Sequence, residues 1–162
     1  MKNVMLLLWA AVLLFAAGCG GREDAETAEP DLKDLYAGGA EAFGWTEDGM
    51  TDVEGELLDA YYPGLSALSI RQLVAKVPAM SSDVNEIVLV QCETGEDAEA
   101  AEAILQARVD AQVESGAWYA ETQAAWEQAA VLRQGTFAAL IASGDHQADW
   151  EARVREAYGI GS

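Results

Sequence analysis

Cys19 is the residue whose type and position most directly indicate a chemical reaction. It follows the small residues 16–18, which close an apolar run that begins at Val4, and one positive charge, Lys2, precedes that run. This order predicts a secretory signal peptide over residues 1–18. The apolar run is too short for a stable transmembrane helix, because it rises only about 21 Å against a hydrocarbon core of about 30 Å.

A cysteine directly after small residues is similar to the signal of bacterial lipoproteins. In that signal the thiol takes a diacylglyceryl group and the cysteine becomes the mature N-terminus. Residues 19–30 are then the lipidated N-terminus and a flexible acidic tether, since residues 20–30 hold four acids and no large apolar residue. We therefore expect a protein held at the cell membrane through acyl chains on Cys19, on the extracytoplasmic face.

The charge of the chain limits its partners. The formal net charge is −19, from 28 acidic and 9 basic residues, and it becomes −20 when residues 1–18 with their single lysine are removed. Nucleic acid is excluded as a partner, because its phosphates require clustered Lys and Arg. Anionic lipid headgroups also repel such a domain, so the acyl chains must do the tethering.

Other residues that could do chemistry lack the spacing that chemistry requires. His146 is the single histidine and has no Cys or His nearby at zinc spacing, so we interpret it as a surface residue. Acids between Asp48 and Glu56 offer oxygen ligands without the spacing of an EF-hand, and we interpret them as a solvated loop. No serine lies in a nucleophile elbow. We expect no catalytic residue, no metal and no cofactor.

One loop is the first place to look for a ligand. Met80, Asp83, Asn85 and Glu86 lie just after Pro78 and combine an apolar side chain with polar ones. Ordinary turn chemistry also explains the polar residues, because Asp and Asn side chains bond to nearby backbone groups. A recognition loop and a simple turn both remain open.

Cys92 has no cysteine partner once Cys19 is acylated, so no intrachain disulfide is expected. It ends the apolar run 87–92, and a free cysteine in such a run is usually a small buried hydrophobe. The tryptophans are expected to lie in a core or a groove; they include Trp45, Trp118, Trp126 and Trp150.

Hydrophobic periodicity predicts the order of elements over residues 31–162, which form a single domain. Helices are expected from Leu32 to Phe43, over 54–61 and 95–115, around 118–126 and over 146–158. Strands are expected over 70–77, 86–92, 131–134 and 136–142, with Gly135 at the second turn. The order α-α-β-β-α-(α)-β-β-α indicates the α+β class, with an antiparallel sheet of about four strands and helices on one face.

Several segments resemble the DUF4358 family of bacterial lipoproteins, a family of unknown function. The most specific segment runs from Val74 to Ile87 and contains Lys76-Val77-Pro78 and Glu86-Ile87. The later order of Arg108-Val109, Gln112, Tyr119 and the hairpin 132–141 also fits. This chain departs from the family where a proline is expected after Tyr119. The resemblance implies a location and a domain extent and supplies no catalytic residue.

Two functional hypotheses follow. The first is a non-enzymatic, membrane-tethered module of the cell envelope that binds a protein, a peptide or a small ligand. The alternative is an extracytoplasmic hydrolase that uses acidic residues, with or without assistance from a divalent cation. With this many acids, some pair of carboxylates is always close in sequence, so abundance alone does not support the second hypothesis.

Overall fold

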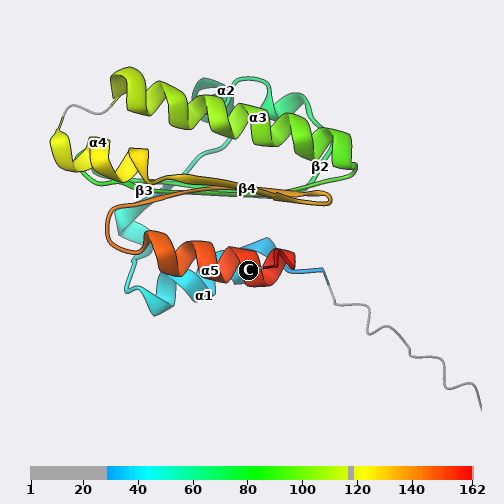
Figure 1. The fold of residues 1–162 in the computed structure, drawn as a ribbon, viewed down its shortest axis with the longest axis horizontal. Helices are drawn as coiled ribbons and strands as arrows, with labels where there is room; N and C mark the ends of the chain where they lie inside the picture. The colour runs from blue at the N-terminus through cyan, green and yellow to red at the C-terminus, as the bar shows by residue number, and fades with distance from the viewer. Residues whose placement is uncertain (1–28, 117–118, 162) are drawn as a thin grey trace, which may run out of the picture.

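A five-stranded antiparallel sheet forms the middle layer of the domain, and helices lie on both of its faces (Figure 1). The computed structural model describes residues 29–116 and 119–161. The α+β class expected from the sequence is confirmed. Signal peptide, Cys19 and most of the tether lie outside the described residues.

The elements follow one another closely in the chain. The helices are α1 (Leu32–Ala42), α2 (Glu56–Tyr61), α3 (Gly95–Ala111), α4 (Ala120–Glu127) and α5 (Gln147–Tyr158). The strands are β1 (Met50–Asp52), β2 (Ile70–Pro78), β3 (Asn85–Cys92), β4 (Ala130–Gln134) and β5 (Phe137–Ser143). Short 3-10 turns cover Glu47–Gly49 and Leu65–Ala67, and a π-helical turn, Gln112–Gly116, extends α3.

The strand order is β1-β2-β3-β5-β4, which places β3 at the centre. All neighbouring strands are antiparallel, and Leu89 of β3 is paired with Val74 on one side and Ala139 on the other. Every residue of β3 after Asn85 is buried. The prediction of a central strand at 86–92 is therefore confirmed, and its cause is an apolar run that must be covered on both faces.

The two faces of the sheet carry separate cores. Val88 and Val90 point toward α3 and α4, whereas Ile87 and Leu89 point toward α1 and α5. Our expectation of helices on one face was thus wrong. Side chains alternate along a strand, so β3 and β5, which are apolar at successive positions, need a helical layer on each side.

The sheet also has one strand more than expected. No strand was predicted between the helices expected at 32–43 and 54–61, but residues 50–52 form β1, with Thr51 paired to Val77. Three residues that are exposed or half-buried show no hydrophobic periodicity, so this strand is recognised only by its pairing with β2.

The helix predicted over 95–115 is a regular α-helix only as far as Ala111, and a separate helix begins at Ala120.

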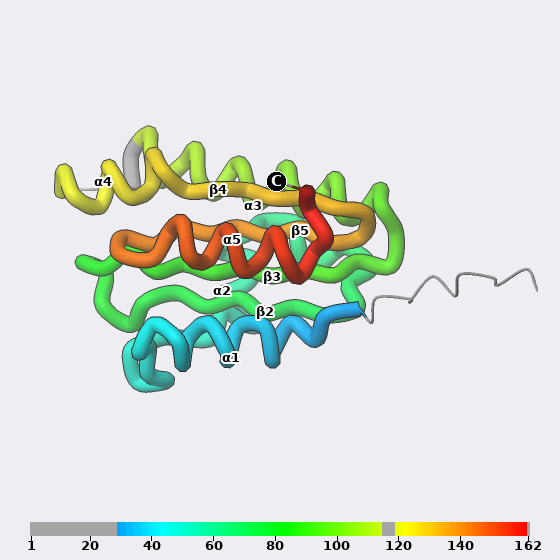
Figure 2. The backbone as a smooth tube through the Cα atoms, turned by 60° about the horizontal axis from the view of Figure 1, so that its bottom comes forward, coloured from blue at the N-terminus to red at the C-terminus, as the bar shows by residue number. Residues whose placement is uncertain are grey.

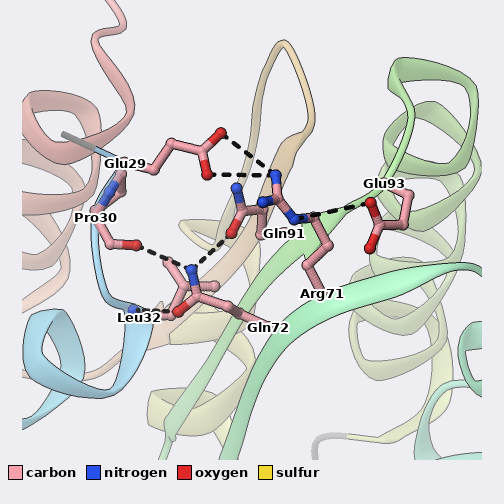
Figure 3. A network of polar contacts seen from close by, with 7 residues as sticks. All are labelled: Glu29, Pro30, Leu32, Arg71, Gln72, Gln91 and Glu93. Carbon is pink, nitrogen blue, oxygen red and sulfur yellow. Dashed lines mark hydrogen bonds and ion pairs between the residues drawn. The ribbon is translucent and has the colours of Figure 1, made fainter. Parts of the chain in front are cut away.

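A polar network attaches the start of α1 to the start of β2 (Figure 3). The Gln72 amide accepts a hydrogen bond from the Leu32 N–H at 3.0 Å and donates to the Pro30 carbonyl at 3.2 Å. Arg71 pairs with Glu29 at 3.3 Å and lies 3.8 Å from Glu93. These contacts hold α1 alongside β2, as Figure 2 shows.

Gly39 allows α1 to pack closely on α5. A Cβ atom at this position would lie 2.6 Å from Cζ3 of Trp150, which is fully buried. At the neighbouring Gly38, an added Cβ meets mainly the flexible end of the Arg153 side chain. The two adjacent glycines therefore have different surroundings.

We predict that Gly39→Ala lowers the free energy of unfolding by about 1–3 kcal/mol, because the buried Trp150 ring must shift to admit the methyl group. Gly38→Ala is the matched control and should cost less, since Arg153 can rotate away and alanine favours the helix. Urea unfolding followed by tryptophan fluorescence measures both. Equal losses for the two variants would contradict close packing at Gly39.

Candidate functional site

A buried ion pair lies between the central strand and α3. Glu86 is only 2% exposed, and its Oε1 and Oε2 accept hydrogen bonds from Arg108 Nε at 2.9 Å and Nη2 at 2.8 Å. The Tyr62 hydroxyl also donates to Glu86 Oε1, at 2.8 Å. Both carboxylate oxygens are therefore occupied, and the buried charge is paired by a planar, bidentate partner.

Aromatic rings hold the Arg108 guanidinium in place. Its central carbon lies 4.7 Å from the ring centroid of Tyr61 and 5.5 Å from that of Trp126. Cation–π attraction of this kind is worth about 0.5–2 kcal/mol, most where water is excluded. With Glu86 at its edge and rings against it, Arg108 has a nearly fixed orientation.

Glu86 raises the pKa of Arg108 and of the Tyr62 hydroxyl. Burial works against the charged form of Arg108, but the hydrogen bonds and negative charge of Glu86 outweigh it and raise the pKa of Arg108. Burial, together with the Glu86 charge, raises the pKa of Tyr62 well above its usual range. At neutral pH the site therefore contains a permanent guanidinium and a neutral phenol.

Both residues of the pair line a groove of about 660 Å³, which we call the Arg108 groove. The loop after β2, the start of β3, α3, its π-helical turn and α4 surround it. Most of its polar side chains are uncharged. The lining residues are Tyr61, Val77, Pro78, Ala79, Ser81, Asp83, Val84, Asn85, Glu86, Arg108, Gln112, Tyr119, Thr122 and Trp126.

Three of the four residues of the proposed ligand loop line this groove. Asp83 lies exposed in the loop, Asn85 and Glu86 begin β3, and Met80 is 64% exposed and not among the lining residues. Asn85 Oδ1 accepts a hydrogen bond from the Ser143 hydroxyl at 2.9 Å. Asn85 therefore has a local structural role as well as a place in the groove.

Sequence reasoning missed the partners of Glu86. Arg108 lies three residues after Leu105 and beside Val109, both of which are buried on the inner side of α3. A basic residue next to an apolar stripe and an acid inside an apolar strand each need a buried partner. A charged residue at each of these two apolar positions was therefore the sequence signal that could have predicted the pair. The ring contacts of Tyr61 and Trp126 depend on tertiary packing and gave no signal.

A second hollow of about 850 Å³, which we call the edge groove, runs between α1 and the edge of β2. Lys76 crosses it, with its ammonium 2.7 Å from Asp52 and 5.5 Å from the ring centroid of Tyr36. Burial, followed by the charges of Asp52 and Glu47, raises the pKa of Tyr36 to about 12. Tyr36 is therefore a neutral phenol in this wall at physiological pH.

The remaining candidate residues have structural surroundings. Cys92 is fully buried, as expected, and burial followed by the charge of Asp97 raises its thiol pKa. His146 is half-buried rather than freely exposed, because its ring stacks on Phe43 at 4.6 Å. Trp150 and Trp126 are buried and Trp45 is half-buried, whereas Trp118 lies outside the described residues.

Two further findings concern metal and membrane. Within residues 29–116 and 119–161, no group of three or more His, Cys, Asp or Glu side chains is placed to hold a metal ion. In the same part of the chain, no helix is both long and apolar enough to cross a membrane. The acylation of Cys19 is tested by neither finding and stays a prediction.

Residues from the segments that carry the family resemblance meet in the Arg108 groove: Glu86, Arg108, Gln112 and Tyr119 all line it. The model of the family described as "Domain of unknown function (DUF4358)" matches residues 45–143. The chain belongs to the DUF4358 family. It matches no curated protein and no solved structure. All residues that line the Arg108 groove lie within the part matched by the DUF4358 model.

We predict that Arg108→Met lowers the free energy of unfolding by about 3–5 kcal/mol, because it leaves the Glu86 charge buried without a partner. The double variant Glu86→Gln, Arg108→Met should lose less than the single variant. It contains no buried charge, and the Gln side chain still accepts from Tyr62. Urea unfolding of both variants at pH 7 measures the difference.

The control is Arg133→Met, because the pair of Arg133 with Glu102, another α3 residue, is more than a third exposed at both side chains. Its loss should be much smaller than that of Arg108→Met, because an exposed pair is screened by water and salt. Similar losses for Arg108→Met and Arg133→Met would show that burial does not set the strength of the Glu86 pair.

Proposed function

We propose that this DUF4358 protein is a lipid-anchored, non-enzymatic binding module on the extracytoplasmic face of the cell membrane, and that its Arg108 groove holds an uncharged, hydroxyl-rich ligand of glycan type. One observation carries the proposal. The Arg108 guanidinium lines a groove, is held by Glu86 and lies close to two aromatic rings. This arrangement prepares directed N–H donors before any ligand arrives.

Arg108 has N–H donors that Glu86 does not use. A guanidinium carries five N–H groups, and Glu86 accepts from Nε and Nη2. Among the described residues, Nη1 has no hydrogen-bond partner. A ligand hydroxyl or carbonyl oxygen is the natural acceptor for these groups. Because the guanidinium is already oriented, little side-chain entropy is lost when it binds.

Charge favours a neutral ligand over an anion. The Arg108 charge is compensated by Glu86, Asp83 adds a negative charge at the groove, and the mature chain carries about 20 excess negative charges. An anionic ligand would be repelled on approach. Amide and hydroxyl side chains supply both donors and acceptors around the groove; they are Ser81, Asn85, Gln112 and Thr122.

An aromatic side chain completes the wall. Tyr119 is 65% exposed and lines the groove. A tyrosine ring offers an apolar face for the C–H groups of a sugar and a hydroxyl for its polar edge. Binding is favoured over acid-catalysed hydrolysis because Glu86 is engaged on both oxygens and Asp83 is the only other carboxylate among the lining residues.

The location rests on Cys19. Each methylene group of an acyl chain that is buried in the bilayer contributes about 0.8 kcal/mol to membrane binding, and two or more chains hold a protein stably at a membrane. The acidic domain adds repulsion from anionic lipid rather than attraction. We therefore propose that the acyl chains on Cys19 alone attach the protein to the membrane.

We predict that Cys19→Ser moves the protein from the membrane fraction to the soluble extracytoplasmic or culture fraction. Cys92→Ala is the matched control, since it removes the other cysteine and leaves the proposed acylation site intact. Fractionation of cells that express each full chain, followed by immunoblotting, measures the distribution. Unchanged membrane attachment of Cys19→Ser would contradict the lipid anchor.

For the groove, we use N-acetylglucosamine tetrasaccharide as the probe, because it offers both hydroxyl and acetamido carbonyl acceptors. We predict that Tyr119→Ala weakens its binding at least about five-fold, about 1 kcal/mol, through loss of the stacking ring. Isothermal titration calorimetry with the full chain in detergent measures the dissociation constant.

Leu57→Ala is the matched control, because Leu57 is also an exposed large hydrophobic residue and lines neither groove. It should leave the affinity unchanged. Absence of tetrasaccharide binding, or equal binding by the wild type and Tyr119→Ala, would refute the glycan assignment.

A further inference from the structure

The edge groove exists because β1 stops early. The Val53 N–H donates to the Ala75 carbonyl at 2.9 Å, which is the last backbone bond between this segment and β2. Gly55 then adopts a φ of +53°, a conformation that glycine reaches without strain, and the chain turns away into α2. Toward the start of β2, none of the strands described in residues 29–116 and 119–161 pairs with it on this side.

The free edge offers backbone groups. Successive residues of a strand direct their N–H and C=O groups to opposite sides. The Ala75 carbonyl points away from β3, so both backbone groups of Leu73, two residues earlier, do so as well. Among the described residues, these Leu73 groups have no backbone partner on that side. An extended chain laid along the edge satisfies them.

The side walls of this edge are apolar. On the side of α1, Tyr36, Ala37 and Ala40 face the groove, while Val53 and Leu58 line the opposite side. Thus both sets of alternating side chains of an added strand would meet apolar surface. A helix beside an open strand edge is the arrangement in which β-strand addition occurs in peptide-binding domains.

We propose that the edge groove binds an extended peptide segment of another protein, which adds to the free edge of β2 as a sixth strand. This inference is independent of the ligand proposed for the Arg108 groove. The bound segment pairs with Leu73 through its backbone, and its side chains alternate between α1 and the Val53–Leu58 side. A peptide with apolar β-branched residues at its centre fits both walls.

Length and charge narrow the peptide further. The 11 residues of α1 extend about 16 Å at 1.5 Å per residue, which matches about five residues of strand. Four exposed acids line the groove, Glu41, Glu47, Asp52 and Glu54, against two lysines, of which Lys76 is already paired with Asp52. This charge imbalance favours basic residues at the two ends of the segment.

The test uses the pentapeptide acetyl-Lys-Val-Ile-Val-Lys-amide and the full chain, labelled with ¹⁵N in detergent. We expect saturable shifts of the Leu73 amide signal and at least ten-fold slower hydrogen exchange at this position. The charge-reversed peptide acetyl-Glu-Val-Ile-Val-Glu-amide should bind at least five-fold more weakly at low salt. Equal affinities of the two peptides would overturn the charge assignment.

Peptide backbone methylation separates strand addition from side-chain docking alone. Only one edge of the added strand faces β2, so N-methylation of alternate residues on that edge removes the hydrogen bonds. One of the two alternately methylated peptides should lose binding at least ten-fold and the other should keep it. If both bind like the parent peptide, or if Leu73 does not respond, strand addition is refuted.

Variants of α1 locate the peptide in the groove. Ala37 is exposed and lines the groove, whereas Ala42 is exposed and does not. Ala37→Trp should reduce peptide affinity at least five-fold, and Ala42→Trp should leave it unchanged. Equal effects would overturn the site. Concentration-dependent dimers in sedimentation, with Leu73 shifts and no peptide effect, would assign the edge to a second copy instead and also overturn the proposal.

Discussion

The burial of β3 on both faces is the constraint on which the rest of the structure depends. An apolar strand at the centre of a sheet excludes water from every side, and each face then requires a helical layer. α3 and α4 supply one layer, and α1 and α5 supply the other. Glu86 is the acidic residue placed within this strand, so a cation had to come from the covering helix.

The Glu86–Arg108 pair links the core to the groove. A buried pair of this kind adds little net stability compared with apolar residues, because both ions lose their hydration. Its contribution is instead orientation, since a guanidinium that is bonded at one edge and stacked on rings retains few alternative conformations. The same contacts that satisfy a buried charge thus give the guanidinium, which lines the groove, a defined orientation.

Much of the fold was predictable from local pattern, and most of the site was not. The strand at 86–92, the helix that begins after Thr94 and the turn at Gly135 follow from hydrophobic periodicity, a capping residue and a glycine with positive φ. The second helical layer was missed because an apolar run shows that a strand is buried, but not by which helices.

The Arg108 groove shows most clearly what local sequence pattern does not predict. Asp83, Asn85 and Glu86 were found as a polar cluster, but Arg108 lies 22 residues beyond Glu86 along the chain. The spacing of residues within a short segment does not predict a contact over this distance along the chain. It also does not predict that rings from α2 and α4 pack near Arg108. The edge groove exists because β1 pairs with only part of β2 before the chain turns away at Gly55. Only the register of the sheet shows this.

The contacts of Pro30 with Gln72 and of Glu29 with Arg71 fix the point at which the N-terminal segment enters the domain. The chain enters the domain where β2 begins, whereas the Arg108 groove lies where β2 ends and β3 starts. The ten Cα–Cα steps from Cys19 to Glu29 reach at most about 36 Å, so an anchored domain would stay close to the lipid surface. The proposed anchor would thus pull on one end of the sheet, and the Arg108 groove lies at the other end, away from the point where the tether enters the domain.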